Sequence, residues 1–199
     1  THAIMEVSSH ALDQNRTKGI NFHSAIFTNF TQDHLDYHKT VENYFKAKAK
    51  LFKNIGTDSF VVINNDDRYA GRIKKITRGK IVTYGIENKA CVTAKKIKFN
   101  SLHTEFLLVT PRGEDNLTTH LVGRHNVYNV LAAIAWAQEE GINISTIKSA
   151  IAKFSFVPGR LEGIDFKGNF RVFVDYAHTE DALKNIIRTL RCLTKKRII

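Results

Sequence analysis

Short β-rich apolar runs that each end in polar residues, with helical stretches between them, constrain this fold more than any other feature. They are Ala3–Val7, Ser24–Asn29, Ser59–Asn64, Lys80–Gly85 and Phe170–Val174. Runs of this length alternating with helices are typical of buried strands in a parallel sheet. Ligands of open parallel sheets bind beyond the carboxyl ends of the strands. The sequence therefore predicts an α/β protein with its functional side chains at one sheet edge.

The region from Ala90 to Gly123 has a different pattern. Its apolar residues alternate with polar ones, and turn residues separate the runs, which is typical of antiparallel hairpins. The expected strands are Val92–Phe99, His103–Thr110 and Leu117–Val122. We interpret this region as a small antiparallel subdomain attached to the mostly parallel sheet.

Helices and a linker follow the hairpins. Apolar residues predict a helix over Val130–Ala137 and a second one over Ile144–Phe154. The Pro158-Gly159 pair then interrupts the helical pattern. We therefore place one domain at 1–156 and a second unit, with its linker, at 157–199, where a strand over Phe170–Val174 precedes a helix from Asp181 to about Leu193.

Lys48 breaks the pattern of its own helix. From about Val41 the chain has helical periodicity, with an apolar stripe of Val41, Tyr44, Phe45, Leu51 and Phe52. Lys46, Lys50 and Lys53 fall on the opposite, charged face, whereas Lys48 lies within the stripe. Its stem can pack while the ammonium reaches solvent or a carboxylate. Alternatively, a neutral amine captures carbon dioxide as a carbamate, which supplies anionic oxygen to Mg²⁺.

Glu6 and His34 are the partners that would favour the carbamate. Glu6 lies in a predicted apolar strand, where a carboxylate needs a metal or a strong donor. A salt bridge to Arg16 is the alternative. His34 follows the strand that ends near Asn29, although a single histidine is more often structural than a metal ligand. Further possible contacts to a ligand come from the same turn, namely Asp33, Asp36 and His38.

Asparagine and aspartate side chains mark a further candidate region. Asn126 and Asn129 share one helix face, and their amides match a purine edge as well as they match N-capping. Asp175 ends a strand, a position suited to ribose hydroxyls. The acidic end of Asn64–Asp67 is interpreted as a helix cap or as a contact to a metal-bound water.

Composition excludes several classes. The 199 residues contain no apolar run long enough to span a membrane and no signal peptide. Cys91 and Cys192 lack CxxC spacing, so a disulfide scaffold or zinc finger is not expected, and a reducing cytoplasm fits. A formal charge of +11 suits anionic partners. Two alternatives therefore stay open, a module that binds nucleic acid or another polyanion, and a metal-dependent hydrolase built on the cluster from Asp33 to His38.

These blocks together resemble the Mur ligases, most closely those of the MurE type, which add the third amino acid of the peptidoglycan stem peptide. The resemblance rests on Met5–Leu12, Phe27–His38, Tyr44–Lys48, Gly123–Asn129, Gly159–Glu162 and Asp175–Thr179. It implies part of a P-loop-type central ATPase domain, followed by the start of a Rossmann-like C-terminal domain. A folylpolyglutamate-type or other amide ligase is the neighbouring alternative.

The resemblance also implies roles for individual residues. Glu6, His34 and a carbamylated Lys48 would be the Mg²⁺ ligands and the catalytic residues. The UDP-muramoyl dipeptide would contact Ser8, Gln14 and Arg16. Asn126 and Asn129 would face the adenine of ATP, Arg160 its phosphates, and Asp175 its ribose.

The chain also departs from the family pattern. A Gly-x-x-Gly-Lys-Thr/Ser phosphate loop is absent, and Thr179-Glu180-Asp181 has glutamate where relatives usually have proline. We therefore expect the chain to be a catalytically inactive piece of a longer protein, here called the parent. The parent is expected to be a cytoplasmic monomer that binds the nucleotide-linked dipeptide, ATP and an amino acid, and neither nucleic acid nor membrane.

Overall fold

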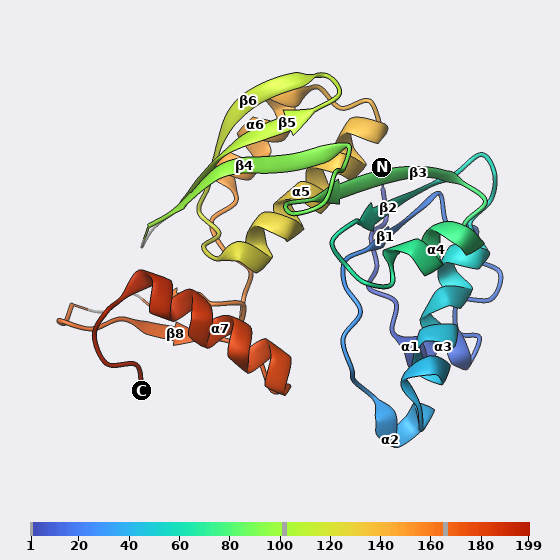
Figure 1. The fold of residues 1–199 in the computed structure, drawn as a ribbon, viewed down its shortest axis with the longest axis horizontal. Helices are drawn as coiled ribbons and strands as arrows, with labels where there is room; N and C mark the ends of the chain where they lie inside the picture. Colours follow the sequence, from blue (N-terminus) through green and yellow to red (C-terminus); the bar gives the residue numbers. More distant parts are fainter. Residues whose placement is uncertain (1, 101–102, 165–166) are drawn as a thin grey trace.

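A computed structural model describes residues 2–100, 103–164 and 167–199. Its largest element is a six-stranded sheet in which sequence order and spatial order coincide (Figure 1). The strands are β1 (Ser24–Phe27), β2 (Phe60–Asn64), β3 (Lys80–Gly85), β4 (Val92–Phe99), β5 (Thr104–Thr110) and β6 (Gly113–Thr119). Within the described residues, no helix has the length and apolar character needed to cross a membrane.

The sheet is parallel in its first part and antiparallel in its second. The strands from β1 to β4 pair in parallel, with Ile26 opposite Val62 and Val62 opposite Val82. The pairs β4–β5 and β5–β6 are antiparallel. The predicted hairpins therefore exist, but they continue the main sheet. The last strand begins at Gly113 instead of Leu117, because the chain turns directly after Thr110, where Thr110 pairs with Gly113.

Two apolar clusters cover opposite faces of the sheet, and the side-chain alternation of β2 shows this directly. Val62 belongs to one cluster, with Val127, Leu131 and Ile134 of α5 (Arg124–Glu139). Val61 and Ile63, its neighbours, belong to the other cluster. All three β2 residues are fully buried. A strand buried on both faces reads as a continuous apolar run, as the sequence predicted.

Helices α3 (Val41–Lys53) and α4 (Ala70–Ile76) supply much of the second cluster. Two short helices, α1 (Ser9–Asp13) and α2 (Leu35–His38), pack against α3 (Figure 1). Helix α6 (Ile144–Lys153) packs on β6 and α5. The helices predicted from Val41 and over Ile144–Phe154 are confirmed within one residue. The helix predicted over Val130–Ala137 exists but begins six residues earlier, at Arg124.

The C-terminal unit consists of a two-stranded antiparallel sheet and one helix. Its elements are β7 (Glu162–Ile164), β8 (Val172–Val174) and α7 (Glu180–Leu193). Gly159 in the linker adopts φ +65°, and a Cβ there would collide with the ring of Tyr176. The segment Leu161–Phe166, which follows the linker in the sequence, ends in residues 165 and 166, which lie outside the described residues. The boundary between 156 and 157 stays a prediction.

The strand predicted over Ala3–Val7 is wrong. This segment has no regular secondary structure and is largely exposed, with Ile4 86% exposed. A strand exists only where a neighbour supplies ladder hydrogen bonds. Among the described residues, β1 pairs with β2 alone, so Ala3–Val7 does not pair with the free edge of β1 and forms no strand.

Candidate functional site

Lys48 lies on the core-facing side of α3, half-buried beside Tyr44. Its Nζ is 5.7 Å from the centroid of the Tyr44 ring. Burial lowers the pKa of the Lys48 amine, and the charges of Glu6 and Asp33 act in the opposite direction. Tyr44 and Phe45 on the same stripe are buried, whereas Lys46 and Lys53 are exposed. Helical periodicity therefore predicted correctly which lysine lies against the core.

Glu6 reaches this region from an irregular segment. Its side chain is exposed, so the prediction of a carboxylate buried inside a strand is wrong. Among the described ion pairs there is none between Glu6 and Arg16, and Arg16 is itself exposed. The negative charge of Glu6 nevertheless acts on the Lys48 amine and opposes the lowering of its pKa by burial.

His34 approaches the same place from the loop after β1. It adopts φ +52°, a left-handed conformation that is uncommon for a residue other than glycine. Its backbone N–H donates to Asp33 Oδ1 at 2.7 Å, and its ring lies 5.9 Å from the Tyr44 ring. The His34 ring and the Lys48 amine therefore both lie beside Tyr44, which joins the loop to α3.

These side chains test whether a magnesium ion suits the region. In the described part of the chain, no three His, Cys, Asp or Glu side chains are arranged to hold a metal. Glu6 and His34 provide two donors near Lys48, whose ammonium would repel a cation. A carbamate on Lys48 would replace that charge by anionic oxygen, the donor that Mg²⁺ prefers. The residues therefore fit the ion when Lys48 is carbamylated.

His38 is committed to packing. It is buried, and its Nε2 lies 2.9 Å from the hydroxyl of buried Ser9. Burial, followed by the charge of His10, lowers the pKa of the His38 imidazole. Its ring lies 5.4 Å from that of Tyr44. Because its Nε2 is engaged with the Ser9 hydroxyl, His38 is unsuited to the metal-binding role that the hydrolase alternative would give it.

The side chains expected to contact the dipeptide lie around α1. Ser8 is the N-cap of this helix, since its hydroxyl accepts from Ala11 N at 3.1 Å. Gln14 is the C-cap and Arg16 follows it, both exposed. The binding role of these three residues stays a prediction.

The asparagines lie at the start of α5, but neither is its N-cap. Gly123 holds that position with φ +106°. Asn126 is buried, donates to Val122 O at 2.9 Å and accepts from Asn129 Nδ2 at 3.3 Å. The N-capping alternative is therefore wrong. The amide of Asn129 is exposed at the helix surface.

Asp175 lies close to this helix start. Its carboxylate accepts from Leu161 N and Ala177 N, each at 2.7 Å, which shapes the loop after β8. Burial lowers the pKa of His125, and the negative charge of Asp175 acts against this shift. The first turn of α5 and the end of β8 are therefore neighbours.

A pocket of about 400 Å³ separates α5 from the C-terminal unit. Arg160 and Asn126 both line it. The Arg160 guanidinium also lies 5.8 Å from the Tyr176 ring. The structure therefore gathers the residues predicted to bind nucleotide around one junction.

Sequence reasoning missed the role of the aspartates after β2. Helix capping was expected there, but the cap of α4 is Tyr69, with no side-chain hydrogen bond. Asp67 accepts instead from Phe30 N and Tyr69 N. Asp66 accepts from the loop after β3 and from the Tyr128 hydroxyl. The adjacent residues Asp66 and Asp67 could have indicated such a role. Their hydrogen-bond partners, however, are distant in sequence.

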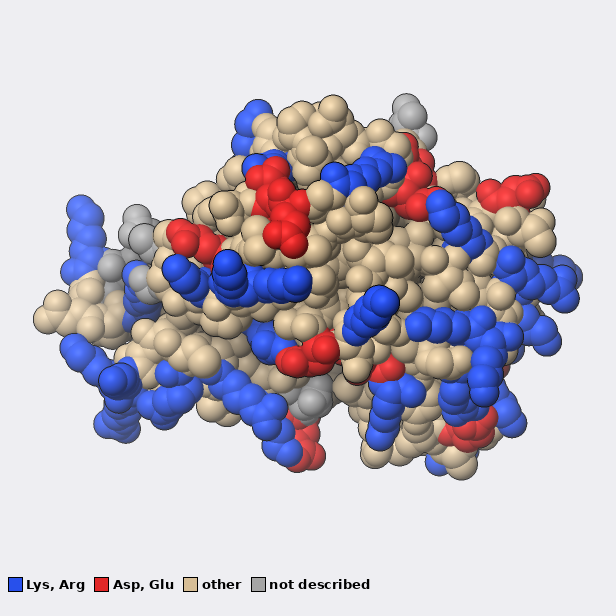
Figure 2. Space-filling view, turned by 45° about the horizontal axis from the view of Figure 1, so that its top comes forward, with Lys and Arg blue, Asp and Glu red and all other residues tan. Residues whose placement is uncertain are grey.

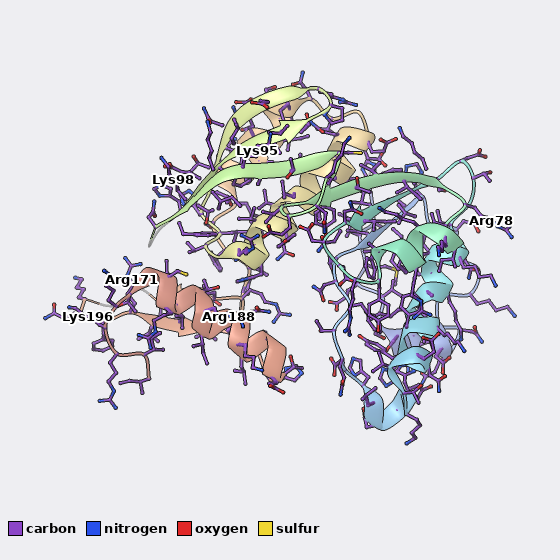
Figure 3. All side chains as sticks on the ribbon, viewed as in Figure 1. Arg78, Lys95, Lys98, Arg171, Arg188 and Lys196 are labelled. Carbon is purple, nitrogen blue, oxygen red and sulfur yellow. The ribbon has the colours of Figure 1, made fainter. Side chains whose placement is uncertain are left out.

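Basic residues lie on several parts of the face shown in Figure 2. In Figure 2 the lysines and arginines are spread over the face shown, with acidic residues among them. Figure 3 places Arg78 at one end of the molecule and Arg171 and Lys196 at the other. A nucleic-acid interface usually presents a basic stripe or patch, so this distribution does not favour the polyanion alternative.

The fold is that of an α/β protein with a mostly parallel sheet. Its candidate ligand-binding residues form two groups, one beside α3 and one between α5 and the C-terminal unit. The model of the Mur ligase middle domain matches residues 1–137. The chain therefore belongs to the Mur ligase family.

Individual relatives agree with this assignment. The UDP-N-acetylmuramoyl-L-alanyl-D-glutamate–2,6-diaminopimelate ligase of Bacillus velezensis is 47% identical over 98% of this chain and 41% of its own length. A solved structure of a ligase with the same name has a TM-score of 0.79 and 33% identity, over 94% of this chain and 39% of that one.

More distant neighbours share the fold alone. A mutant of L. casei FPGS has a TM-score of 0.73 and 22% identity, over 92% of this chain and 45% of that one. The chain spans about two fifths of the length of the curated relatives it matches.

Proposed function

We propose that the chain is the central ATP-binding part of a ligase that joins 2,6-diaminopimelate to UDP-N-acetylmuramoyl-L-alanyl-D-glutamate in peptidoglycan synthesis. The observation that carries the proposal is the half-buried Lys48 amine, with the carboxylates of Glu6 and Asp33 near it and the His34 ring beside the same tyrosine. The names of relatives at 47% and 45% identity supply the substrates.

The reaction would proceed by transfer of a phosphoryl group. The terminal carboxylate of the bound dipeptide attacks the γ-phosphate of ATP, which gives an acyl phosphate and releases ADP. The incoming amine then displaces phosphate and forms the amide bond. Two anions must approach each other in the first step, so charge screening is the main task of the protein. Glu6, His34 and carbamylated Lys48 would hold a magnesium ion that screens this charge when bound.

Other residues would orient the substrates. Ser8, Gln14 and Arg16 surround α1 and would contact the muramoyl dipeptide. Asn126 and Asn129 would face the adenine, Asp175 the ribose, and Arg160 the phosphates. The first group lies next to α3, and Asn126 and Arg160 of the second group line the pocket between α5 and the C-terminal unit. We further propose that the parent works in the cytoplasm, where its nucleotide substrates are found.

The decisive variant is Lys48→Ala in the parent, compared with Lys46→Ala, which removes an exposed lysine of the same helix. We expect Lys48→Ala to lower kcat about 100-fold or more, the scale for losing one preorganised charge-stabilising group. Lys46→Ala should keep kcat within about twofold. Isotope-labelled bicarbonate should give a carbamate signal by NMR in the unsubstituted protein that Lys48→Ala lacks.

Two results would contradict the proposal. Full ligation by Lys48→Ala, with and without bicarbonate, would remove Lys48 from the mechanism. A parent that forms no amide from ATP, the muramoyl dipeptide and diaminopimelate would refute the proposed activity.

A further inference from the structure

The carboxylate of Asp66 joins three separate segments of the chain. Its Oδ2 accepts from Ile86 N at 2.6 Å and Glu87 N at 2.9 Å, and its Oδ1 accepts from Asn88 N at 2.7 Å. The hydroxyl of Tyr128 on α5 donates to Oδ2 at 2.8 Å. The end of β2, the loop between β3 and β4, and the start of α5 therefore meet at one side chain.

Local structure makes this junction specific. Three backbone N–H groups point at one carboxylate, an arrangement that a neutral side chain reproduces poorly. Gly85 allows the approach, since a Cβ there would lie 3.0 Å from Asp66 Oδ1. Burial, followed by the hydrogen bond to Asp66, raises the pKa of Tyr128 to about 12, so its hydroxyl remains a donor at neutral pH.

A second link connects the same loop to the same helix. Arg124, the first residue of α5, forms an ion pair with Glu87. Asn126 lies between the two anchored positions, Arg124 and Tyr128, and Asn129 follows Tyr128 directly. Because a helical turn moves as a unit, anchoring Arg124 and Tyr128 also fixes the direction of the two asparagine amides.

We propose that Asp66 and Tyr128 are positioning residues for the nucleotide: their hydrogen bond fixes the first turns of α5 and so aims Asn126 and Asn129 at the purine. This inference rests on the proposed function, because it assigns those amides to the adenine of ATP. Asp66 and Tyr128 would act on the nucleotide through Asn126 and Asn129.

Tyr128→Phe in the parent removes the hydroxyl and keeps the ring. We expect the KM for ATP to rise roughly 3- to 10-fold, the effect of losing one hydrogen bond of this kind, while kcat and the KM for the muramoyl dipeptide stay within about twofold. The matched control is Tyr69→Phe, which removes a phenol hydroxyl from another half-buried tyrosine. The control should leave all three constants and the melting temperature close to their original values.

Asp66→Asn tests the other side of the bond. An amide has one acceptor oxygen and presents N–H groups to the N–H donors of the loop. The backbone amides of residues 86–88 should therefore exchange hydrogen faster, and the KM for ATP should rise at least as much as in Tyr128→Phe. The double variant should be little worse than Asp66→Asn alone, because the two changes break the same bond.

The outcomes separate this inference from the proposed function. An unchanged KM for ATP in Tyr128→Phe, with an active parent, would overturn the inference alone. An equal rise of all substrate KM values with a lower melting temperature would also overturn it, since that pattern indicates general loosening. An inactive parent that binds no ATP would refute both.

Discussion

Individual side chains in this protein acquire their properties from neighbours that are distant in sequence. Lysine side chains are usually exposed. Lys48 nevertheless lies on the apolar stripe of α3 and so faces the core, where burial lowers the pKa of its amine. This placement followed from helical spacing alone. The environment of Glu6 did not, because the apolar run around it forms no strand in the structure. The partners of Asp66 were also beyond prediction, since they depend on where β3 and α5 meet.

His38 gives a prediction at the residue scale. Burial holds the pKa of its folded-state imidazole below 6.5, so the unfolded chain binds more protons just below that pH. The free energy of unfolding should therefore fall as the pH drops below about 6.5, until it levels off below the folded-state pKa. His38→Asn should flatten this slope and lower stability by about 1 kcal/mol at pH 7 through loss of the contact to Ser9.

Urea unfolding at a series of pH values measures both effects. His120→Asn, at an exposed position, serves as the control and should keep the original slope. His125 contributes in the same direction, because burial lowers the pKa of its imidazole as well. An identical pH dependence in His38→Asn and in the original protein would contradict the prediction.

Among the helices and strands, helices with strong apolar periodicity were predictable from the sequence. Whether a short apolar run pairs with another strand was not. Helix α3 begins at Val41, as predicted. The apolar stripe starts at this residue, and Thr40 directly before it is the N-cap. Strands β2 and β3 were also found, since both are apolar runs within the parallel sheet. The segment Ala3–Val7 has the same composition as these strands, but composition specifies no partner. The attachment of β4 to β3 was likewise invisible, because strand order is a long-range property.

The N-cap of α3 provides the element-scale prediction. Thr40 Oγ1 accepts from Asn43 N at 3.1 Å. Thr40→Ala should lower the free energy of unfolding by about 1 kcal/mol, the usual cost of losing a threonine cap. Thr57→Ala, in an exposed turn, should change it by less than about 0.5 kcal/mol. Equal urea midpoints for the two variants would show that the cap does not stabilise the helix.

The whole molecule consists of one sheet covered on both faces and a C-terminal unit attached through a short linker. The residues of both buried clusters lie between Ala25 and Ile147. Among its described residues, the C-terminal unit contributes nothing to either cluster, although Thr189 of α7 lies against Gly123. The linker position was predictable from Pro158 and Gly159, whereas the contact between α7 and the start of α5 was not.

A chain ending at residue 156 tests this organisation. We expect it to unfold cooperatively, with a melting temperature within about 5 °C of the 199-residue chain, because both clusters remain complete. Circular dichroism during heating measures the transition. A broad or absent transition would contradict the boundary predicted between 156 and 157.

The contact between Gly159 and Tyr176 has a consequence for the linker. The ring occupies the space that any other side chain at 159 would need, and the backbone there has the positive φ that glycine tolerates best. The linker between the two parts is therefore restricted in its conformation and does not behave as a flexible linker. The backbone at Gly159 thereby sets the path of the chain, and with it the orientation of the residues proposed to bind nucleotide on the two sides of the linker.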